Sequence, residues 1–379
     1  MDKLNTTVKR HHTSGSHDAC EPGLSTKSCS KSSERSKKHV DIDEMSDATH
    51  EDDLYPRNLS LKPSLKKLER KLEKVVHWAW NAVSFEVLPK WLQDNEFLKC
   101  SHRPPMYSFR GCIKSMFRMH TETWNIWTHF LAFVFFLFLV VGIYTFGDYV
   151  TYWFEDIKIH DLPWDEQVMM MFFFVGVLAC TLCSAMFHLF SNHSERISQI
   201  FGRLDYSGIA FLITGSSVPS YYYGFYCATI SKYTHIAVLL VLCALSVSIS
   251  MWSRFQMPKY RPLRFLVFLI FGLYGIIPFL HILIRDGYTL STEAYSLWGM
   301  LTMGSIYVLG ATLYVLRVPE RFFPGKFDIW ASSHQLFHMC VVTGALMHYD
   351  SLLNMVKYRL DIGGCIDGLP VPVQLQVSM

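Results

Sequence analysis

Residues Val168–Phe187 read VMMMFFFVGVLACTLCSAMF, a run of twenty residues without a charged side chain. A helix of about twenty predominantly apolar residues is long enough to cross the roughly 30 Å hydrocarbon core of a bilayer. The composition agrees with a membrane location: 50% of the 379 residues are hydrophobic and only 18% are charged, below the roughly 25% that is usual in soluble domains. The stretch therefore predicts a membrane-spanning helix.

Apolar runs of similar length recur along the chain. The predicted spans cover residues 126–146, 167–188, 204–225, 233–252, 264–284, 296–316 and 331–351. The third and the seventh of these are the least apolar. The sequence therefore predicts an all-α fold, a bundle of seven transmembrane helices. The net charge of +3 gives no indication of a nucleic-acid partner, and we expect none.

The chain before the first span has a different composition. Residues 1–60 are rich in Ser, His and Lys and poor in apolar residues, so we expect a disordered tail. Residues 61–120 should lead into the membrane, starting with a basic amphipathic helix that either lies on the membrane surface or packs on the protein. The transmembrane domain should cover residues 121–352, followed by a tail over residues 353–379.

The distribution of basic residues predicts the orientation. Nine lysines and arginines lie in or beside the loops after the second, fourth and sixth spans, against three in the loops after the first, third and fifth. Cytoplasmic loops carry the excess of positive charge in membrane proteins. We therefore expect a cytosolic N-terminus and, with seven spans, an extracellular C-terminus.

Four ionisable residues from three distant spans converge at one predicted depth. His188 ends the second span, Asp205 begins the third, and His334 and His338 begin the seventh. In the predicted topology all four lie at the cytosolic ends of their helices. His334 and His338 are four residues apart and so share a helix face, the spacing at which two histidines chelate a metal.

Three neutral imidazoles with a fourth position open to water form a zinc site of the catalytic type. Zinc lowers the pKa of a bound water toward about 7, and Asp205 could orient that water or take its proton. Imidazole also accepts copper, iron or nickel. A single histidine within a span is more often a hydrogen-bonded packing residue, so the metal assignment depends on the convergence of all three.

Other polar residues of the spans are less informative. Ser184 lies four residues before His188 and is either a catalytic hydrogen-bond donor or a packing serine. Four further histidines are expected to be structural: His120, His129, His281 and His348.

Cysteine positions suggest one disulfide. Cys227, after the third span, and Cys365, in the C-terminal tail, are the only cysteines that this topology places in the oxidising exterior. We hypothesise a Cys227–Cys365 bridge that pins the tail over the outer face. Two free thiols are an equal alternative, because a bridge requires a Cα separation of roughly 5.5 Å.

Several stretches carry a resemblance to a known family. They are DNEFL at Asp94–Leu98, HRPPM at His102–Met106, HTET at His120–Thr123, NIWTH at Asn125–His129, LDYSGIA at Leu204–Ala210 and RFFPGKFDIW at Arg321–Trp330. With them the chain resembles the progestin and adipoQ receptor family, and within it the adiponectin receptors, from about residue 85 to Cys365.

The resemblance implies seven helices with a cytosolic N-terminus in the plasma membrane. It implies zinc held by His188, His334 and His338, with Asp205 contacting the zinc through water and Ser184 as a motif serine. It further implies a C1q-like protein ligand outside the cell, and hydrolysis of ceramide. A homo-oligomer is left open.

Two functions follow. The first is a zinc hydrolase acting on ceramide-type lipid amides, with Asp205 and Ser184 as catalytic residues and a ceramide-like substrate or fatty acid as partner. The second is a hormone receptor or membrane-state sensor whose zinc is structural. Three ligands plus an acid favour catalysis, whereas the lack of a second acid to protonate the leaving amine favours the sensor. We favour a receptor with hydrolytic capacity.

Overall fold

The computed structural model describes residues 82–145, 159–362, 364–366 and 369–371. The tail predicted over residues 1–60 and the basic helix expected to follow it lie outside the described residues. The long helices are α3 (Thr123–Thr145), α5 (Trp164–Phe190), α6 (Glu195–Gly224), α7 (Thr229–Met251), α8 (Arg261–Leu273), α9 (Ile276–Glu293), α10 (Leu297–Leu316) and α11 (Ser333–Ile362). The shorter elements are α2 (Phe109–Ser115), the 3-10 helices η1 (Phe85–Val87), η2 (Lys90–Leu92), η3 (Ile159–Asp161), η4 (Ser253–Gln256) and η5 (Pro258–Tyr260), and the strands β1 (Gly364–Ile366) and β2 (Leu369–Val371).

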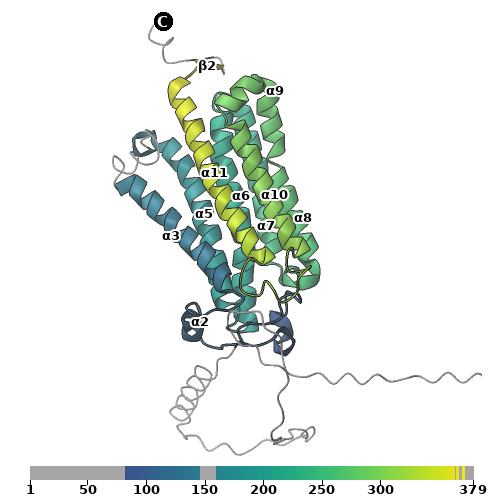
Figure 1. The fold of residues 1–379 in the computed structure, drawn as a ribbon. Coiled ribbons are helices and arrows are strands. Elements are labelled where there is room, and N and C mark those ends of the chain that lie inside the picture. The colour runs from purple at the N-terminus through teal and green to yellow at the C-terminus, as the bar shows by residue number, and fades with distance from the viewer. Residues whose placement is uncertain (1–81, 146–158, 363, 367–368, 372–379) are drawn as a thin grey trace, which may run out of the picture. The chain divides into compact units, whose positions relative to one another are not determined.

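The seven predicted spans are confirmed as helices that lie alongside one another (Figure 1). The fifth is divided into α8 and α9 at Tyr274 and Gly275. Inside α9 the backbone of Gly287 has φ +81°, a left-handed conformation that glycine adopts without strain. Three helices extend nine or more residues beyond the predicted spans: α6 begins at Glu195 rather than at 204, α9 ends at Glu293 rather than at 284, and α11 continues to Ile362 rather than ending at 351.

Helices α6 and α11 occupy the interior of the bundle. Helix α6 packs against α5, α7, α8 and α11, and α11 packs against α3, α6 and α10. Five helical stretches of the described chain are long and apolar enough to cross a membrane, namely α3, α5, α7, the stretch α8–α9 and α10. The two interior helices are less apolar, because their neighbours separate them from the surroundings and they can carry polar side chains.

Small residues bring the backbones of α5 and α6 together. A Cβ atom on Gly215 would lie 2.5 Å from the carbonyl oxygen of Phe172, and one on Gly176 would lie 2.7 Å from that of Phe211. Farther along, a Cβ on Gly208 would lie 3.0 Å from the Cα of Cys180. Glycines at these three positions are therefore what allows the closest helix contact in the bundle.

The segment before α3 closes the end of the bundle at which α5 ends and α11 begins. The buried Arg103 side chain donates to the carbonyl oxygens of His188 and Leu189 and, at 2.9 Å, to Ser115 Oγ. These carbonyls belong to the last turn of α5 and have no partner within the helix. Arg103 therefore supplies the hydrogen bonds that a helix end needs when it is buried.

Other motif residues attach the same segment to the bundle. Asp94 accepts a hydrogen bond from Arg261 at 2.7 Å, and Asn95 donates to Glu320 at 3.0 Å. The carboxylate of Asp328 accepts the backbone N–H groups of two residues of the segment, at 2.9 and 2.7 Å. Residues of the stretches DNEFL, HRPPM and RFFPGKFDIW thus make tertiary contacts that hold this end of the bundle in place.

The opposite end carries the predicted disulfide. Cys227 follows α6, and Cys365 lies in β1, which pairs with β2 in an antiparallel hairpin. The two cysteines are bridged, with a Cα–Cα distance of 5.5 Å, so the hypothesis is confirmed. Beside them the Arg359 guanidinium of α11 forms an ion pair at 3.0 Å with the buried Glu166 of α5.

Candidate metal centre

The structure brings the three predicted histidines together. His188 lies in the last turn of α5, and His334 and His338 lie in the first two turns of α11. One ring nitrogen from each lies within 4.8 Å of the others, and the Nε2 atoms of His188 and His334 are 3.0 Å apart. Two imidazole nitrogens on one tetrahedral zinc ion are separated by about 3.3 Å. Both the donor types and their spacing therefore fit zinc.

The start of α11 is fixed by a buried carboxylate. Glu320, which is fully buried, accepts the backbone N–H of Ser333 at 2.8 Å and also the Ser333 hydroxyl. An acidic group that accepts from the first N–H groups of a helix satisfies them and complements the helix dipole. Because His334 follows Ser333 directly, Glu320 sets the position from which both α11 histidines project.

Glu122 holds the ring of His188. Its Oε2 lies 2.7 Å from His188 Nδ1 and accepts a hydrogen bond from Asn125 Nδ2 at 2.8 Å. Burial alone would raise the pKa of the Glu122 carboxyl, but the hydrogen bonds from His188 and Asn125, with the charge of Arg103, hold it well below its ordinary value. The ionised carboxylate binds Nδ1–H and leaves the Nε2 lone pair free for a metal.

Helix α3 supplies two further contacts. Thr128 Oγ1 donates to the carbonyl of Trp124 at 2.7 Å and lies 3.2 Å from His338 Nδ1. It can therefore accept from Nδ1–H, which again leaves Nε2 for a metal. His129, expected to be a structural residue, stacks on His338 with ring centroids 3.6 Å apart.

Sequence reasoning missed Glu122 and Thr128. Both lie within the stretches that carry the family resemblance. The periodicity of the sequence does not show that either side chain faces the histidines. Their roles depend on how the start of α3 packs against α5 and α11, which is a tertiary property.

Asp205 and Ser184 lie on the same cavity wall as His334 and His338. Ser184, which is buried, lies beside the Asp205 carboxylate. Asp205 is not one of the residues whose ligand atoms form the cluster. This placement agrees with a carboxylate that contacts a metal only through water.

The cavity beside the histidines has a volume of about 770 Å³, within the range of roughly 300–1,000 Å³ that is typical of small-molecule sites. It extends between α6, α8, α9, α10 and α11, and most of its lining is aliphatic or aromatic. Leu273 of α8 and Leu301 of α10 line it and are 41% and 46% exposed, respectively.

A buried cation stands at the metal end of this cavity. Arg264 is 3% exposed, and its guanidinium lies 5.0 Å from the centroid of the Tyr206 ring. It donates to the carbonyl of Phe255 at 2.7 Å. Tyr206 follows Asp205 directly on α6, so the guanidinium lies at the same end of the bundle as the predicted reaction centre.

Comparison with known proteins identifies the family of the chain. Residues 117–349 match the family model described as "Haemolysin-III related". The chain is 44% identical over 297 residues to a protein of Drosophila melanogaster named "Adiponectin receptor protein", covering 78% of this chain and 64% of that one. It is 44% identical over 282 residues to "Progestin and adipoQ receptor-like protein 1" of Caenorhabditis elegans, covering 74% and 62%. The chain thus spans less than two thirds of the length of these two relatives.

A third relative matches over most of its own length. It is an ADIPOR-like receptor of Saccharomyces cerevisiae, 35% identical over 285 residues, with 74% of this chain and 86% of that protein covered. The region matched by the family model, residues 117–349, contains all three histidines. The chain therefore belongs to the haemolysin-III-related family of multi-pass membrane proteins, together with the adiponectin receptor and the progestin and adipoQ receptor-like proteins.

Proposed function

We propose that the protein is a zinc-dependent hydrolase of ceramide-type lipid amides, within a receptor-like membrane protein. One observation carries the proposal: two of the clustered histidines, Asp205 and Ser184 line a single large apolar cavity. A purely structural zinc site is closed by four protein ligands, whereas a catalytic site keeps a position for water and substrate. A cavity of this size and polarity suits a lipid chain.

Each residue then has a role. His188, His334 and His338 would hold the zinc, which when bound supplies a Lewis acid and activates water at neutral pH. Asp205 accepts the proton of the attacking water, and the Ser184 hydroxyl fixes the direction of its carboxylate. The apolar lining binds the acyl chain and excludes bulk water, and Arg264 stabilises the carboxylate that the cleavage releases.

We further propose a plasma-membrane location, with the metal centre toward the cytosol. The support is the excess of basic residues beside the loops at the metal end, nine against three. The disulfides do not decide the orientation, because Cys100, at the metal end, is disulfide-bonded as well as Cys227 and Cys365. The names of the animal relatives refer to adiponectin and adipoQ, so we propose a protein ligand on the outer side, which the family resemblance leads us to expect to be C1q-like.

The second candidate is a receptor or membrane-state sensor with a structural zinc. Glu122 is a second acid beside the histidines, and both its neighbours His188 and Asn125 already bind it. It is thus poorly placed to protonate a leaving amine. This observation favours binding of a lipid without turnover.

Turnover of ceramide by purified protein of verified zinc content separates the two candidates. We expect the wild type to release fatty acid and Asp205→Asn to lose at least a hundredfold in rate, since a positioned base typically contributes 10²–10⁴-fold. Asp361→Asn, at an exposed position in the last turn of α11, is the matched control and should retain activity. Equal slow rates for all three proteins would support the sensor.

A further inference from the structure

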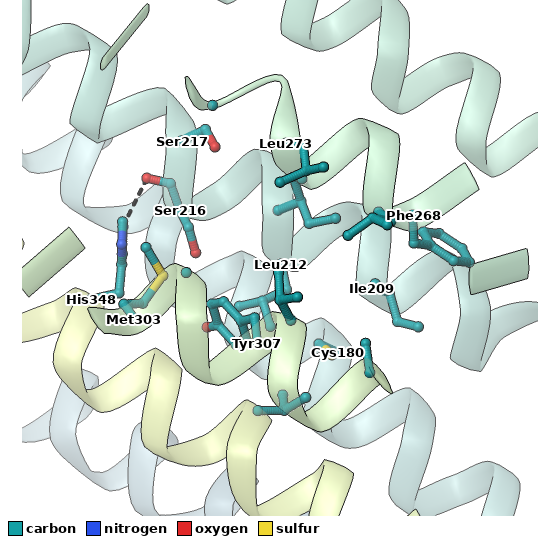
Figure 2. A pocket seen from close by; sticks show the side chains of 18 of the residues that line it. Cys180, Ile209, Leu212, Ser216, Ser217, Phe268, Leu273, Met303, Tyr307 and His348 are labelled. Carbon is teal, nitrogen blue, oxygen red and sulfur yellow. Dashed lines mark hydrogen bonds between the residues drawn. The ribbon is translucent and has the colours of Figure 1, made fainter. Parts of the chain in front are cut away.

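A second polar cluster lies in the cavity, away from the metal centre. Ser216, Ser217 and Ser220 of α6 line the cavity, and so does His348 of α11. Figure 2 shows Ser216, Ser217 and His348 grouped on one side, with Leu212, Ile209 and Phe268 beyond them. Polar side chains inside a membrane bundle are costly and usually functional.

Two atoms of this cluster lack a protein partner. Ser216 Oγ and His348 Nδ1 are buried and have no hydrogen-bond partner among the described residues. Their side chains are enclosed as well, since Ser216 is 7% and His348 is 2% exposed. A buried polar group without a hydrogen bond destabilises the folded state. The bundle therefore retains two unsatisfied groups at the wall of a cavity that can receive a ligand.

The backbone determines which proton-bearing group the cluster can accept. His348 Nε2 lies 2.9 Å from the carbonyl oxygen of Ser216, so Nε2 must carry the proton. In the neutral ring Nδ1 is then an acceptor. A ligand group that donates to Nδ1 and accepts a hydrogen bond from the Ser216 hydroxyl must be both a donor and an acceptor. A hydroxyl meets this requirement.

Anionic groups are disfavoured at this position. Of the described lining residues, only Asp205 and Arg264 carry a formal charge, and both stand at the metal end. A carboxylate or phosphate would meet the Nδ1 lone pair without a cation to balance its charge. The cluster therefore selects a neutral donor.

The helices give the separation between the two polar sites. His348 follows His338 by ten residues on α11, which corresponds to about 15 Å along the helix axis. Ser216 follows Asp205 by eleven residues on α6, about 16 Å. Between them the α6 face is apolar, with Ile209, Leu212 and Ile213 lining the cavity.

We propose that the Ser216–His348 cluster binds a hydroxyl carried on the lipid chain, about 15 Å from the group held at the metal centre. This inference rests on the part of the proposed function that places a lipid chain in the cavity, and does not require hydrolysis. The favoured ligands are fatty acids or fatty amides with a hydroxyl part-way along the chain.

The test compares binding of stearic acid and its mid-chain hydroxylated analogue to zinc-loaded protein in nanodiscs. We expect the wild type to bind the hydroxylated acid about five- to tenfold more tightly, as one or two neutral hydrogen bonds allow. Ser216→Ala should bind both acids equally. Ser248→Ala removes an exposed α7 hydroxyl outside the cavity and should keep the preference.

Thermal unfolding of the ligand-free proteins provides the second readout. Because Ser216 Oγ has no protein partner, Ser216→Ala should unfold at the same temperature or higher while losing the preference. If Ser216 were merely structural, its replacement would lower both the unfolding temperature and the binding preference. Equal binding of the two acids by the wild type would overturn the inference alone. If neither acid binds the wild type, the lipid-binding cavity of the proposed function is wrong as well.

Discussion

The histidines of the metal centre depend on neighbours that hold their rings. The carboxylate of Glu122 binds Nδ1 of His188, and Thr128 lies beside Nδ1 of His338. Both contacts leave the Nε2 lone pair available to bind a metal. The Nε2 of His188 faces that of His334. Partners of this kind orient a ligating imidazole and raise its basicity, so their loss weakens metal binding without removing a ligand.

Replacement of Glu122 tests this role. We expect Glu122→Gln to reduce zinc affinity by about 10–100-fold, because the neutral amide still accepts from His188 Nδ1–H but no longer raises the basicity of the ring. Competition with a chromophoric chelator measures the change. Glu86→Gln, at an exposed residue of η1, is the control. Wild-type affinity in Glu122→Gln would show that the contact is only structural.

Replacing a predicted ligand and replacing the predicted base should have different effects on the zinc content of the protein. His338→Ala should lose most of the zinc, since two imidazoles bind far more weakly than three. Asp205→Ala should keep zinc and lose hydrolysis, because Asp205 lies on the cavity wall and outside the ligand cluster. Elemental analysis of the purified variants decides between the two roles. Zinc loss in Asp205→Ala as severe as in His338→Ala would make the aspartate a direct ligand.

The three ligands were predictable from the sequence because a membrane-spanning helix fixes the depth of each of its residues in the bilayer. Once the spans are assigned, helix direction places His188, His334 and His338 at one level, and the structure confirms their convergence. Glu122 and Thr128 were not predictable, because neither periodicity nor depth indicates which side chain of α3 faces which ring. The polar cluster at Ser216 was missed for the same reason.

The packing of α5 on α6 is the contact that sets the positions of His188 and Asp205. Gly215 and Gly176 face each other across it, and a Cβ on Gly215 would lie 2.5 Å from a backbone oxygen of Phe172. A backbone atom cannot move aside as a flexible side chain can. The two helices would have to separate, and the distance between the two halves of the site would change.

We therefore expect Gly215→Ala to destabilise the protein by roughly 1–3 kcal/mol, the usual effect of overpacking, and to reduce zinc binding. Gly304→Ala in α10 is the matched control, because no atom lies within 4 Å of its added Cβ. The control should be neutral or stabilising by up to about 1 kcal/mol through helix propensity. Thermal unfolding with and without zinc measures both. Equal midpoints for the two variants would contradict the role of close packing.

At the level of elements, the sequence predicted which helices exist better than where they end. The third and seventh spans are weak by hydropathy because α6 and α11 carry the polar residues of the site and lie inside the bundle. The extra turns of α11 bury Leu353 and Val356, and Arg359 pairs with Glu166 of α5. These contacts involve partners far away in the sequence, so local pattern gave no sign that the helix continues to Ile362.

For the molecule as a whole, the two ends of the bundle differ in chemistry. The metal end is joined to the segment before α3 by Arg103, Asp94 and Asp328. The other end is closed by the hairpin of β1 and β2 and by the Cys227–Cys365 bridge, which joins residues 138 positions apart. The proposed orientation places this second end outside the cell.

Thiol labelling on intact cells tests that orientation and the bridge together. Without reduction, a membrane-impermeant maleimide should not label the outer end, because Cys227 and Cys365 are bonded to each other. After treatment with an impermeant reductant, both thiols should react, and the double variant Cys227→Ser/Cys365→Ser should abolish the signal. The disulfide at Cys100 gives no signal if the metal end is cytosolic, since neither reagent crosses the membrane. If labelling after reduction survives in the double variant, the disulfide at Cys100 is reached from outside, the metal end faces outward and the orientation inferred from the basic loops is wrong.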